Sequence, residues 1–473
     1  MISRATLLLM TGQVVFLFSG FLINSGLARI LKPVDYGTFG LVMSILVIVE
    51  LFVITGIPEA IQKYGGERPQ AMAKLISKTL PWQMVYAFCL FGVFWLAAPV
   101  LARTFGHSEL TFFLRIASVD IVIYGLYKYY LGVQNGLHRF VQYTILGIIY
   151  SLSKLAAIFG LVWLGFSIAG ALVGNMLGSL MALVLALFFS RVKKTDAGLE
   201  DIPLVAFVAQ NVLYFVGLNL FFSLDLWFVK YYLPGKSVGL YVSAGVLAKL
   251  TYLISVALSA VLLPSIARSI KIKDDKRTRE LIQDSLRYLV IFLVLVNIVI
   301  TTNSAGIVQL FFGAEYLDAA PILSILAVAL SLLTLMAVIN TMMIANEQMR
   351  ASLVMILSLI ALDAVLNRIL VPRFGLQGAA LATSAVGVLG AIWGGLYVFD
   401  EFKTVLFSKS GLRLTGITLL ILVLSKWLVP VGIDFFIKTG LTGGVYLALL
   451  WLTKEINPVD LRRLKESIGL SKT

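Results

Sequence analysis

Eight ionisable side chains lie inside long apolar stretches of this sequence. They are Glu50, Arg115, Asp120, Lys154, Asp225, Lys249, Asp363 and Lys426. A charged group at the centre of a bilayer costs roughly 2.5–3.5 kcal/mol on insertion scales, so such groups usually face a partner or a water-filled cavity. Lysine and arginine there suit a phosphate ligand, whereas a carboxylate suits a cation or a proton. These residues therefore predict ion or phosphate binding inside a membrane.

The sequence lacks the usual groupings of catalysis and of metal binding. One cysteine, Cys89, excludes a disulfide framework and a cysteine metal site, and two histidines, His107 and His138, are too few for a metal cluster. There is no phosphate-cradling glycine motif. We therefore expect a protein that is not an enzyme, with no catalytic residue, no metal site and no cofactor other than a coupling proton or sodium ion.

The amino-acid composition indicates that these side chains belong to a membrane protein. Of the 473 residues, 60% are hydrophobic and 13% are charged, and the mean hydropathy is +0.97. Such a chain has too little polar surface to cover a water-soluble globule. Apolar runs of about 20 residues follow one another, which predicts an all-α polytopic membrane protein. The fourteen predicted spans are 7–30, 38–58, 80–102, 112–134, 141–164, 167–190, 203–230, 238–266, 287–312, 318–344, 350–371, 375–399, 411–431 and 434–452.

Lysine and arginine gather in alternate loops between these spans. The positive-inside rule places the lysine-rich and arginine-rich loops in the cytoplasm, so we expect both the N-terminus and the C-terminus there. This distribution also explains the net charge of +14 as basic rims against anionic lipid, so we expect no nucleic-acid partner. The segment before residue 288 and the tail are predicted to be interfacial amphipathic helices. The opposite loops hold only Arg29, Lys32, Arg103, Lys230, Lys236, Arg368 and Arg373.

The sequence also repeats itself at a nearly constant offset. "LKPVDYGTF" from Leu31 is similar to "LPGKSVGLY" from Leu233, and Phe105-Gly106 recurs as Phe312-Gly313. A duplicated unit of six spans inserts the same way up twice, which predicts two parallel repeats around an axis along the membrane normal. We expect an N-lobe at 1–195, a C-lobe at 196–402, two extra helices at 403–453 and an amphipathic tail at 454–473. Two lobes around a central cavity are typical of a transporter.

Four segments carry a resemblance to a known family. They are "RILKPVDYGTFGL", "TGIPEAIQKYGG", "VQNGLHRF" with Asn135 and Arg139, and "GLQGAALATSAVG". They resemble the Wzx-type oligosaccharide flippases, or polysaccharide biosynthesis proteins, of the superfamily that includes MATE multidrug exporters and MurJ-type lipid II flippases. The resemblance implies alternating-access transfer of a polyprenyl-pyrophosphate-linked oligosaccharide to the outer leaflet, for cell-surface polysaccharide. It also implies a plasma membrane of a bacterium or archaeon, contacts with membrane lipids and polysaccharide polymerases, and a monomer.

The resemblance also implies which spans line the central cavity, namely the first, second, seventh and eighth. Glu50 and Asp225 then become candidates for coupling-ion binding or gating, although Asp225 could instead form an internal ion pair with Lys249. Pro58 and Pro264 are candidate hinges. The candidate substrate contacts are Lys249, Arg29, Asn24, Asn219 and Gln13, and the remaining intramembrane charges, Arg115, Asp120, Lys154, Asp363 and Lys426, form a second set.

Three structural interpretations accompany these candidates. Asp120 is expected to pair with Asn135 on a neighbouring helix. The tyrosines around Lys128 are expected to form an interfacial belt. Gly170, Gly174 and Gly178 recur every four residues, which predicts a face for close helix packing.

Three other functions stay open at this point. A membrane glycosyltransferase or polymerase usually carries a large outer loop with catalytic side chains, and the predicted outer loops are short. A MATE-type drug exporter predicts twelve spans and an acidic cavity. A lipid II flippase shares both the span count and the cationic cavity with an oligosaccharide flippase.

Overall fold

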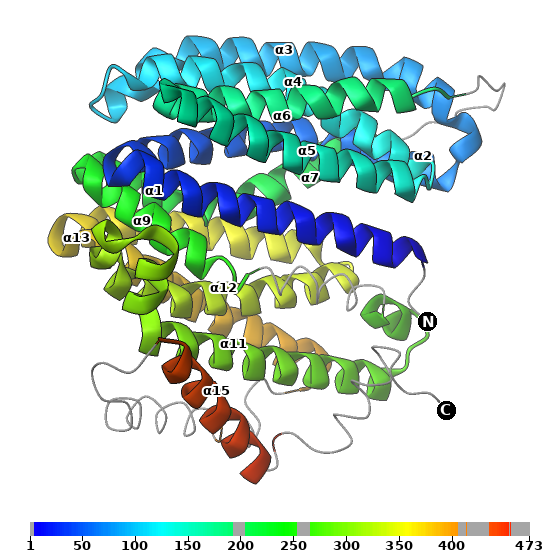
Figure 1. The fold of residues 1–473 in the computed structure, drawn as a ribbon. Coiled ribbons are helices and arrows are strands. Elements are labelled where there is room, and N and C mark those ends of the chain that lie inside the picture. The colour runs from blue at the N-terminus through cyan, green and yellow to red at the C-terminus, as the bar shows by residue number, and fades with distance from the viewer. Residues whose placement is uncertain are drawn as a thin grey trace. The chain divides into compact units, whose positions relative to one another are not determined.

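The computed structural model describes residues 4–192, 204–252, 265–404 and 435–453, together with Arg413 and Glu455 (Figure 1). Every regular element in these residues is helical. Seven helical stretches are long and apolar enough to cross a membrane, or eight if the bent pair α7–α8 is one span. The predicted all-α polytopic class is therefore confirmed. Pro264, Lys426 and, apart from Arg413 and Glu455, the predicted span 411–431 and tail 454–473 lie outside the described residues.

The chain forms two compact units, residues 1–239 and 240–473. Helices α7 and α8 pack against α1 within the first unit. The expected lobes at 1–195 and 196–402 stay a prediction. In that unit α5 packs along α6, α4 packs on α6 and α3, and α1 packs on α4 and α5. Its helices are α1 (Arg4–Ile54), α2 (Ile57–Glu67), α3 (Met72–Thr104), α4 (Leu110–Gly136), α5 (Phe140–Leu161), α6 (Ser167–Phe189), α7 (Leu204–Leu220) and α8 (Leu224–Tyr232), and α9 (Gly235–Ala248) begins there.

Helix α1 reverses direction at a single residue. Lys32 has φ 62° and ψ 171°, and Pro33 starts the second half of the helix. The hydroxyl of Tyr36 donates a hydrogen bond to Asn24 Oδ1 over 3.0 Å. Residues twelve apart in a straight helix lie about 18 Å apart, so this bond requires a tight turn. The predicted break between the spans 7–30 and 38–58 is confirmed.

Further backbone breaks recur along the chain. Gly165 (φ 93°) separates α5 from α6, and Gly375 (φ 59°) divides α13. Gly106 (φ 73°) ends α3, and Gly313 (φ 98°) ends α11. The members of each pair are about 210 positions apart, close to the offset of the sequence repeat. The recurrence is what a duplication would produce.

The glycines of α6 bring that helix into close contact with α5. A Cβ on Gly174 would lie 2.6 Å from Ile158 Cα, and a Cβ on Gly178 would lie 2.5 Å from Lys154 Cβ. Only glycine leaves room for backbones at this distance. The predicted packing face is confirmed.

The second unit is organised around α12. It packs along α11 and α13, while α15 packs on α11. Ile282 and Leu286 are buried in the core that these helices share, at 0% and 3% exposure. The prediction of a separate interfacial helix before residue 288 is therefore wrong, because α11 continues through that segment. The long helices in the described part of this unit are α11 (Asp275–Phe312), α12 (Ala320–Ala345), α13 (Met349–Phe402) and α15 (Phe435–Leu452).

Candidate functional site

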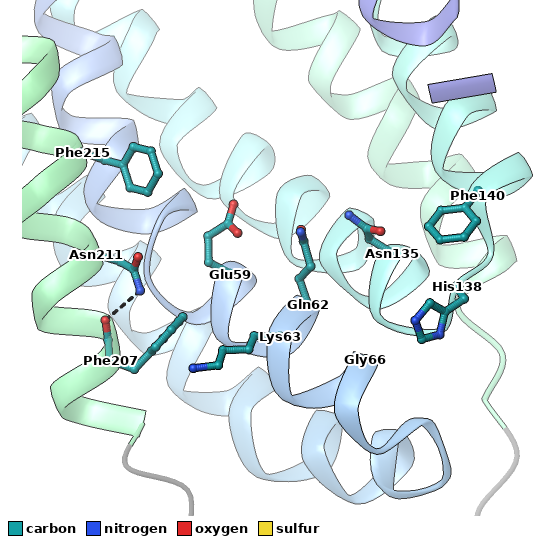
Figure 2. Close-up of a pocket in the computed structure, with 10 residues that line it drawn as sticks. All are labelled: Glu59, Gln62, Lys63, Gly66, Asn135, His138, Phe140, Phe207, Asn211 and Phe215. Atoms are coloured by element: carbon teal, nitrogen blue, oxygen red, sulfur yellow. Dashed lines mark hydrogen bonds between the residues drawn. The ribbon is translucent and has the colours of Figure 1, made fainter. Parts of the chain in front are cut away.

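A cavity of about 460 Å³ lies beside α2 in the first unit (Figure 2). Helix α2 begins at Ile57 with Pro58 in its first turn, where the missing N–H of proline costs no hydrogen bond. Its apolar face, including Ile61, is buried in the bundle. The residues of its other face recur at helical spacing. Glu59, Gln62, Lys63 and Gly66 line the cavity from that face.

Helix α7 supplies the opposite wall of the cavity. Phe207, Asn211 and Phe215 face it from this helix (Figure 2). The amide of Asn211 donates to the carbonyl oxygen of Phe207 over 3.0 Å. The ammonium of Lys63 lies 4.8 Å from the centre of the Phe207 ring, a cation–π distance. This contact holds a cation of α2 against an aromatic ring of α7.

The connection between α4 and α5 closes the third side of the cavity. It contributes Asn135, His138 and Phe140. Arg139 donates from Nη1 to the carbonyl oxygens of Phe189 at 3.3 Å and Arg191 at 3.4 Å. Of the two motif residues, Asn135 therefore faces the cavity, whereas Arg139 binds the end of α6 and fixes the wall.

These side chains define the ligands that the cavity suits. Carboxylate and amide groups accept and donate hydrogen bonds side by side, which matches the hydroxyl groups of a sugar. Aromatic rings offer flat apolar surface, and a lysine offers a charge for phosphate. Within the described residues, no group of three His, Cys, Asp or Glu side chains could hold a metal ion.

A second polar cluster lies inside the bundle of the first unit. Glu50 and Asp120 are only 6% and 2% exposed. Asp120 Oδ2 accepts a hydrogen bond of 2.5 Å from Asn175 Nδ2, and Lys154 Nζ donates to the Tyr150 hydroxyl over 3.5 Å. Glu50 interacts electrostatically with both Asp120 and Lys154. The structure thus brings together three predicted residues, Glu50, Asp120 and Lys154, and places them in the bundle.

Two interpretations of this region are wrong. Asp120 does not pair with Asn135, because both lie far apart along the same helix, α4, and Asn175 on α6 binds the Asp120 carboxylate. The tyrosines near Lys128 do not form a belt, since Tyr127 and Tyr129 are 1% and 0% exposed. Tyrosine is stable at such positions when its hydroxyl has a partner. The hydroxyl of Tyr129 lies 3.0 Å from Thr79 Oγ1.

Several candidate substrate residues have defined surroundings in the first unit. Asn24 bonds the Gly20 carbonyl and the Tyr36 hydroxyl, and so fixes the reversal of α1. Asn219 bonds the carbonyl of Phe215. Gln13 lines a cavity of about 110 Å³ between α1, α4 and α5. Arg29 is exposed next to the break.

Four other predicted intramembrane charges lie in the described residues, namely Arg115, Asp225, Lys249 and Asp363. The guanidinium of Arg115 lies 5.2 Å from the centre of the Trp95 ring. Asp225 is buried at 6% exposure, and its Oδ1 accepts a bond from the Leu226 amide over 2.7 Å. In the second unit, Lys249 is exposed in the turn that follows α9, and Asp363 is buried at 1% exposure.

A family model described as "Polysaccharide biosynthesis protein" matches residues 27–321, more than half of the chain. The chain belongs to this family. The resemblance seen in the sequence is confirmed. The uncharacterized membrane protein YabM of Bacillus subtilis (strain 168) is 26% identical over 333 residues, which are 63% of this chain and 60% of that protein.

Solved structures share the fold of this family member. The lipid II flippase MurJ in an inward closed conformation matches with a TM-score of 0.76 and 18% identity, over 94% of this chain and 99% of that chain. An inward-facing MATE multidrug transporter of the MOP superfamily matches with a TM-score of 0.68 and 14% identity, over 85% and 99%. A MOP superfamily transporter from Pyrococcus furiosus matches with a TM-score of 0.59 and 16% identity, over 85% of this chain and 95% of that chain. The fold is that of this group of membrane transporters.

Sequence analysis missed the α2 face of this polysaccharide biosynthesis protein. Glu59, Gln62 and Lys63 come directly after the predicted span 38–58 and are not among the predicted site residues. Their spacing of i, i+3 and i+4 is a helical signal that was available in the sequence. The signal is short, and only the fold shows that α7 lies opposite.

Proposed function

We propose that the protein flips a polyprenyl-pyrophosphate-linked oligosaccharide from the cytoplasmic to the outer leaflet by alternating access, for cell-surface polysaccharide synthesis. The observation that supports this most is the cavity between α2, α7 and the α4–α5 connection, in which amides, a carboxylate, a lysine and aromatic rings meet. Membership of the polysaccharide biosynthesis family agrees with a sugar ligand.

The orientation that the basic loops predict gives this cavity its role. With both termini in the cytoplasm, α2 and the α4–α5 connection lie at the cytoplasmic end, where the headgroup is built. The cavity would then receive the headgroup while the polyprenyl tail stays in lipid. We also propose that the protein acts as a monomer in the plasma membrane, in contact with lipids and with polysaccharide polymerases.

Two further roles belong to this proposal. Glu50 and Asp225 are proposed to bind the coupling proton or sodium ion, since both carboxylates are buried in a membrane-spanning bundle. Lys249 and Arg29 are proposed to meet the pyrophosphate as it crosses. Pro58, directly after the break that ends α1, is proposed as a hinge, and Pro264 as its counterpart.

Mass spectrometry of lipid-linked material that copurifies with the protein tests the substrate. We expect pyrophosphate-linked oligosaccharide from the unaltered protein and about tenfold less from Gln62→Ala or Lys63→Gln, because a hydrogen bond to a charged phosphate contributes about that factor. Lys74→Gln, an exposed lysine of α3, is the matched control and should recover normal amounts. Recovery of lipid II alone would favour the second candidate function, to which the MurJ fold match points, and recovery of drugs alone would favour an exporter.

A further inference from the structure

A second cavity, of about 580 Å³, lies in the first unit at the other end of α4. Leu110, the first residue of α4, lines this cavity, whereas Asn135, near the end of the helix, lines the cavity of Figure 2. A helix of 27 residues is about 40 Å long. The two cavities therefore lie at opposite ends of the bundle.

Lys230 is the residue of this second cavity that indicates an anionic ligand. Its side chain lines the cavity and is only 8% exposed. Within the described residues it forms neither a hydrogen bond nor an ion pair. A buried ammonium without a partner costs several kcal/mol, so a position of this kind is stabilised when an anion enters.

The remaining wall limits which anion fits. Asp35 lies in the cavity and accepts a hydrogen bond from the Ser167 hydroxyl over 3.4 Å, and the Glu109 side chain stands at its exposed edge. Carboxylates repel a bare polyanion but accept bonds from hydroxyl groups. Phe113 and Phe166 add apolar surface. A phosphate ester that also carries hydroxyl groups satisfies the cation and the carboxylates together.

We infer that this cavity is an exit-side subsite for a glycosyl phosphate, in which Lys230 binds the phosphate and Asp35 accepts hydrogen bonds from the sugar hydroxyls. The inference rests on the proposed function, because the orientation with both termini inside puts this cavity at the outer end. The same chemistry could come from the substrate headgroup or from the phosphate and glycerol of a phospholipid, and the experiment separates the two.

Thiol protection measures occupancy of the cavity. The only cysteine, Cys89, lies at an exposed position of α3, so Cys89→Ser with Thr38→Cys gives one reporter thiol in the cavity wall. The protein is placed in phosphatidylcholine nanodiscs and labelled with a charged thiol reagent. Two probes are titrated: inorganic pyrophosphate and farnesyl-diphosphate-linked N-acetylglucosamine. We expect both to slow labelling, and the sugar-bearing probe to act at lower concentration.

Substitutions of Lys230 test whether its side chain binds the phosphate. Lys230→Gln should raise the half-protecting concentration about tenfold, whereas Lys230→Arg should keep it within about twofold. Lys236→Gln, an exposed lysine that does not line the cavity, is the control. If the half-protecting concentration is the same for Lys230→Gln and for the protein with Lys230, the inference is overturned.

Two further outcomes separate the inference from the function on which it rests. If phosphatidylglycerol in the nanodiscs protects through Lys230 and the glycosyl probe does not, the subsite belongs to membrane lipid and the inference is wrong. If the glycosyl probe protects through Lys230 while no lipid-linked sugar copurifies with the protein, the subsite stands and the proposed function fails.

Discussion

Lys154 interacts electrostatically with two buried carboxylates, those of Glu50 and Asp120. Removing one partner of a buried ionic group usually costs 3–5 kcal/mol, because the remaining charges stay buried. We therefore expect Lys154→Met to lower the free energy of unfolding by about 3 kcal/mol. Denaturant unfolding in detergent, followed by tryptophan fluorescence, measures it. Lys78→Met, at an exposed position of α3, should change it by less than about 0.5 kcal/mol.

A second substitution shows whether the charges are coupled. Glu50→Gln removes one of the two carboxylates that Lys154→Met leaves behind, so the double variant should be more stable than the sum of the two single losses predicts. Strictly additive losses would show that Lys154 stabilises the bundle through its alkyl chain, and would contradict the ionic interpretation.

At the level of residues, the sequence identified charges but not their partners. Glu50, Asp120 and Lys154 stand out because charges are rare in apolar spans. Their grouping depends on how α1, α4 and α5 pack, which no spacing within one helix encodes. The same limit explains Asn175, which binds Asp120 from α6. Asn135 lies on the same helix as Asp120, near the end of α4, so the predicted pairing between helices was wrong.

The glycine ladder of α6 determines how that helix meets α5. Gly174→Ala would place a methyl group 2.6 Å from the backbone of Ile158, so the helices must separate and lose van der Waals contact. We expect a loss of about 2 kcal/mol in unfolding free energy, measured in the same denaturant assay. Gly160→Ala on α5 is the matched control, because its Cβ would meet no atom within 4 Å. That variant should be neutral or up to about 1 kcal/mol more stable.

At the level of elements, the sequence predicted most of the breaks between helices. The break predicted between the spans 7–30 and 38–58 coincides with the reversal of α1 at Lys32, directly before Pro33, and proline inside a helix removes a backbone hydrogen bond. Gly165 and Gly375 allow the positive φ that separates the later spans. The sequence did not predict helix α2, because this helix is short and polar on one face, and composition alone does not distinguish such a helix from a loop.

The orientation of the whole molecule follows from its basic loops and has a direct test. His107 and His138 are exposed at the two ends of α4. In a Cys89→Ser background, His107→Cys should react with a membrane-impermeant thiol reagent added to intact cells, and His138→Cys should react only after the membrane is permeabilised. The positive-inside rule gives this order. The reverse pattern would place the cavity of Figure 2 outside and contradict the proposed direction of transport.

The two copies of the repeated sequence motif are in close backbone contact in the first unit. A Cβ on Gly239 would clash with the carbonyl group of Pro33, and a Cβ on Gly37 would lie 2.5 Å from the Gly239 nitrogen. In the proposed alternating-access cycle this contact must part for the outer end to open. Gly239→Ala should therefore favour the open state, because the added methyl group cannot fit in the closed one. A thiol at Thr38 should then react several-fold faster with an impermeant reagent.

Gly245→Ala is the control for this prediction, since it lies in the same helix and its Cβ would meet no atom within 4 Å. It should leave the labelling rate unchanged. If Gly239→Ala unfolds the protein instead, its thermal stability in detergent will fall. The thiol at Thr38→Cys will then react as fast as a thiol at an exposed position. Faster labelling of a stable Gly239→Ala protein would show that the contact acts as a gate. Unchanged labelling in a stable protein would show that the two motifs separate without effect on the outer end, and would contradict the role proposed for the repeat.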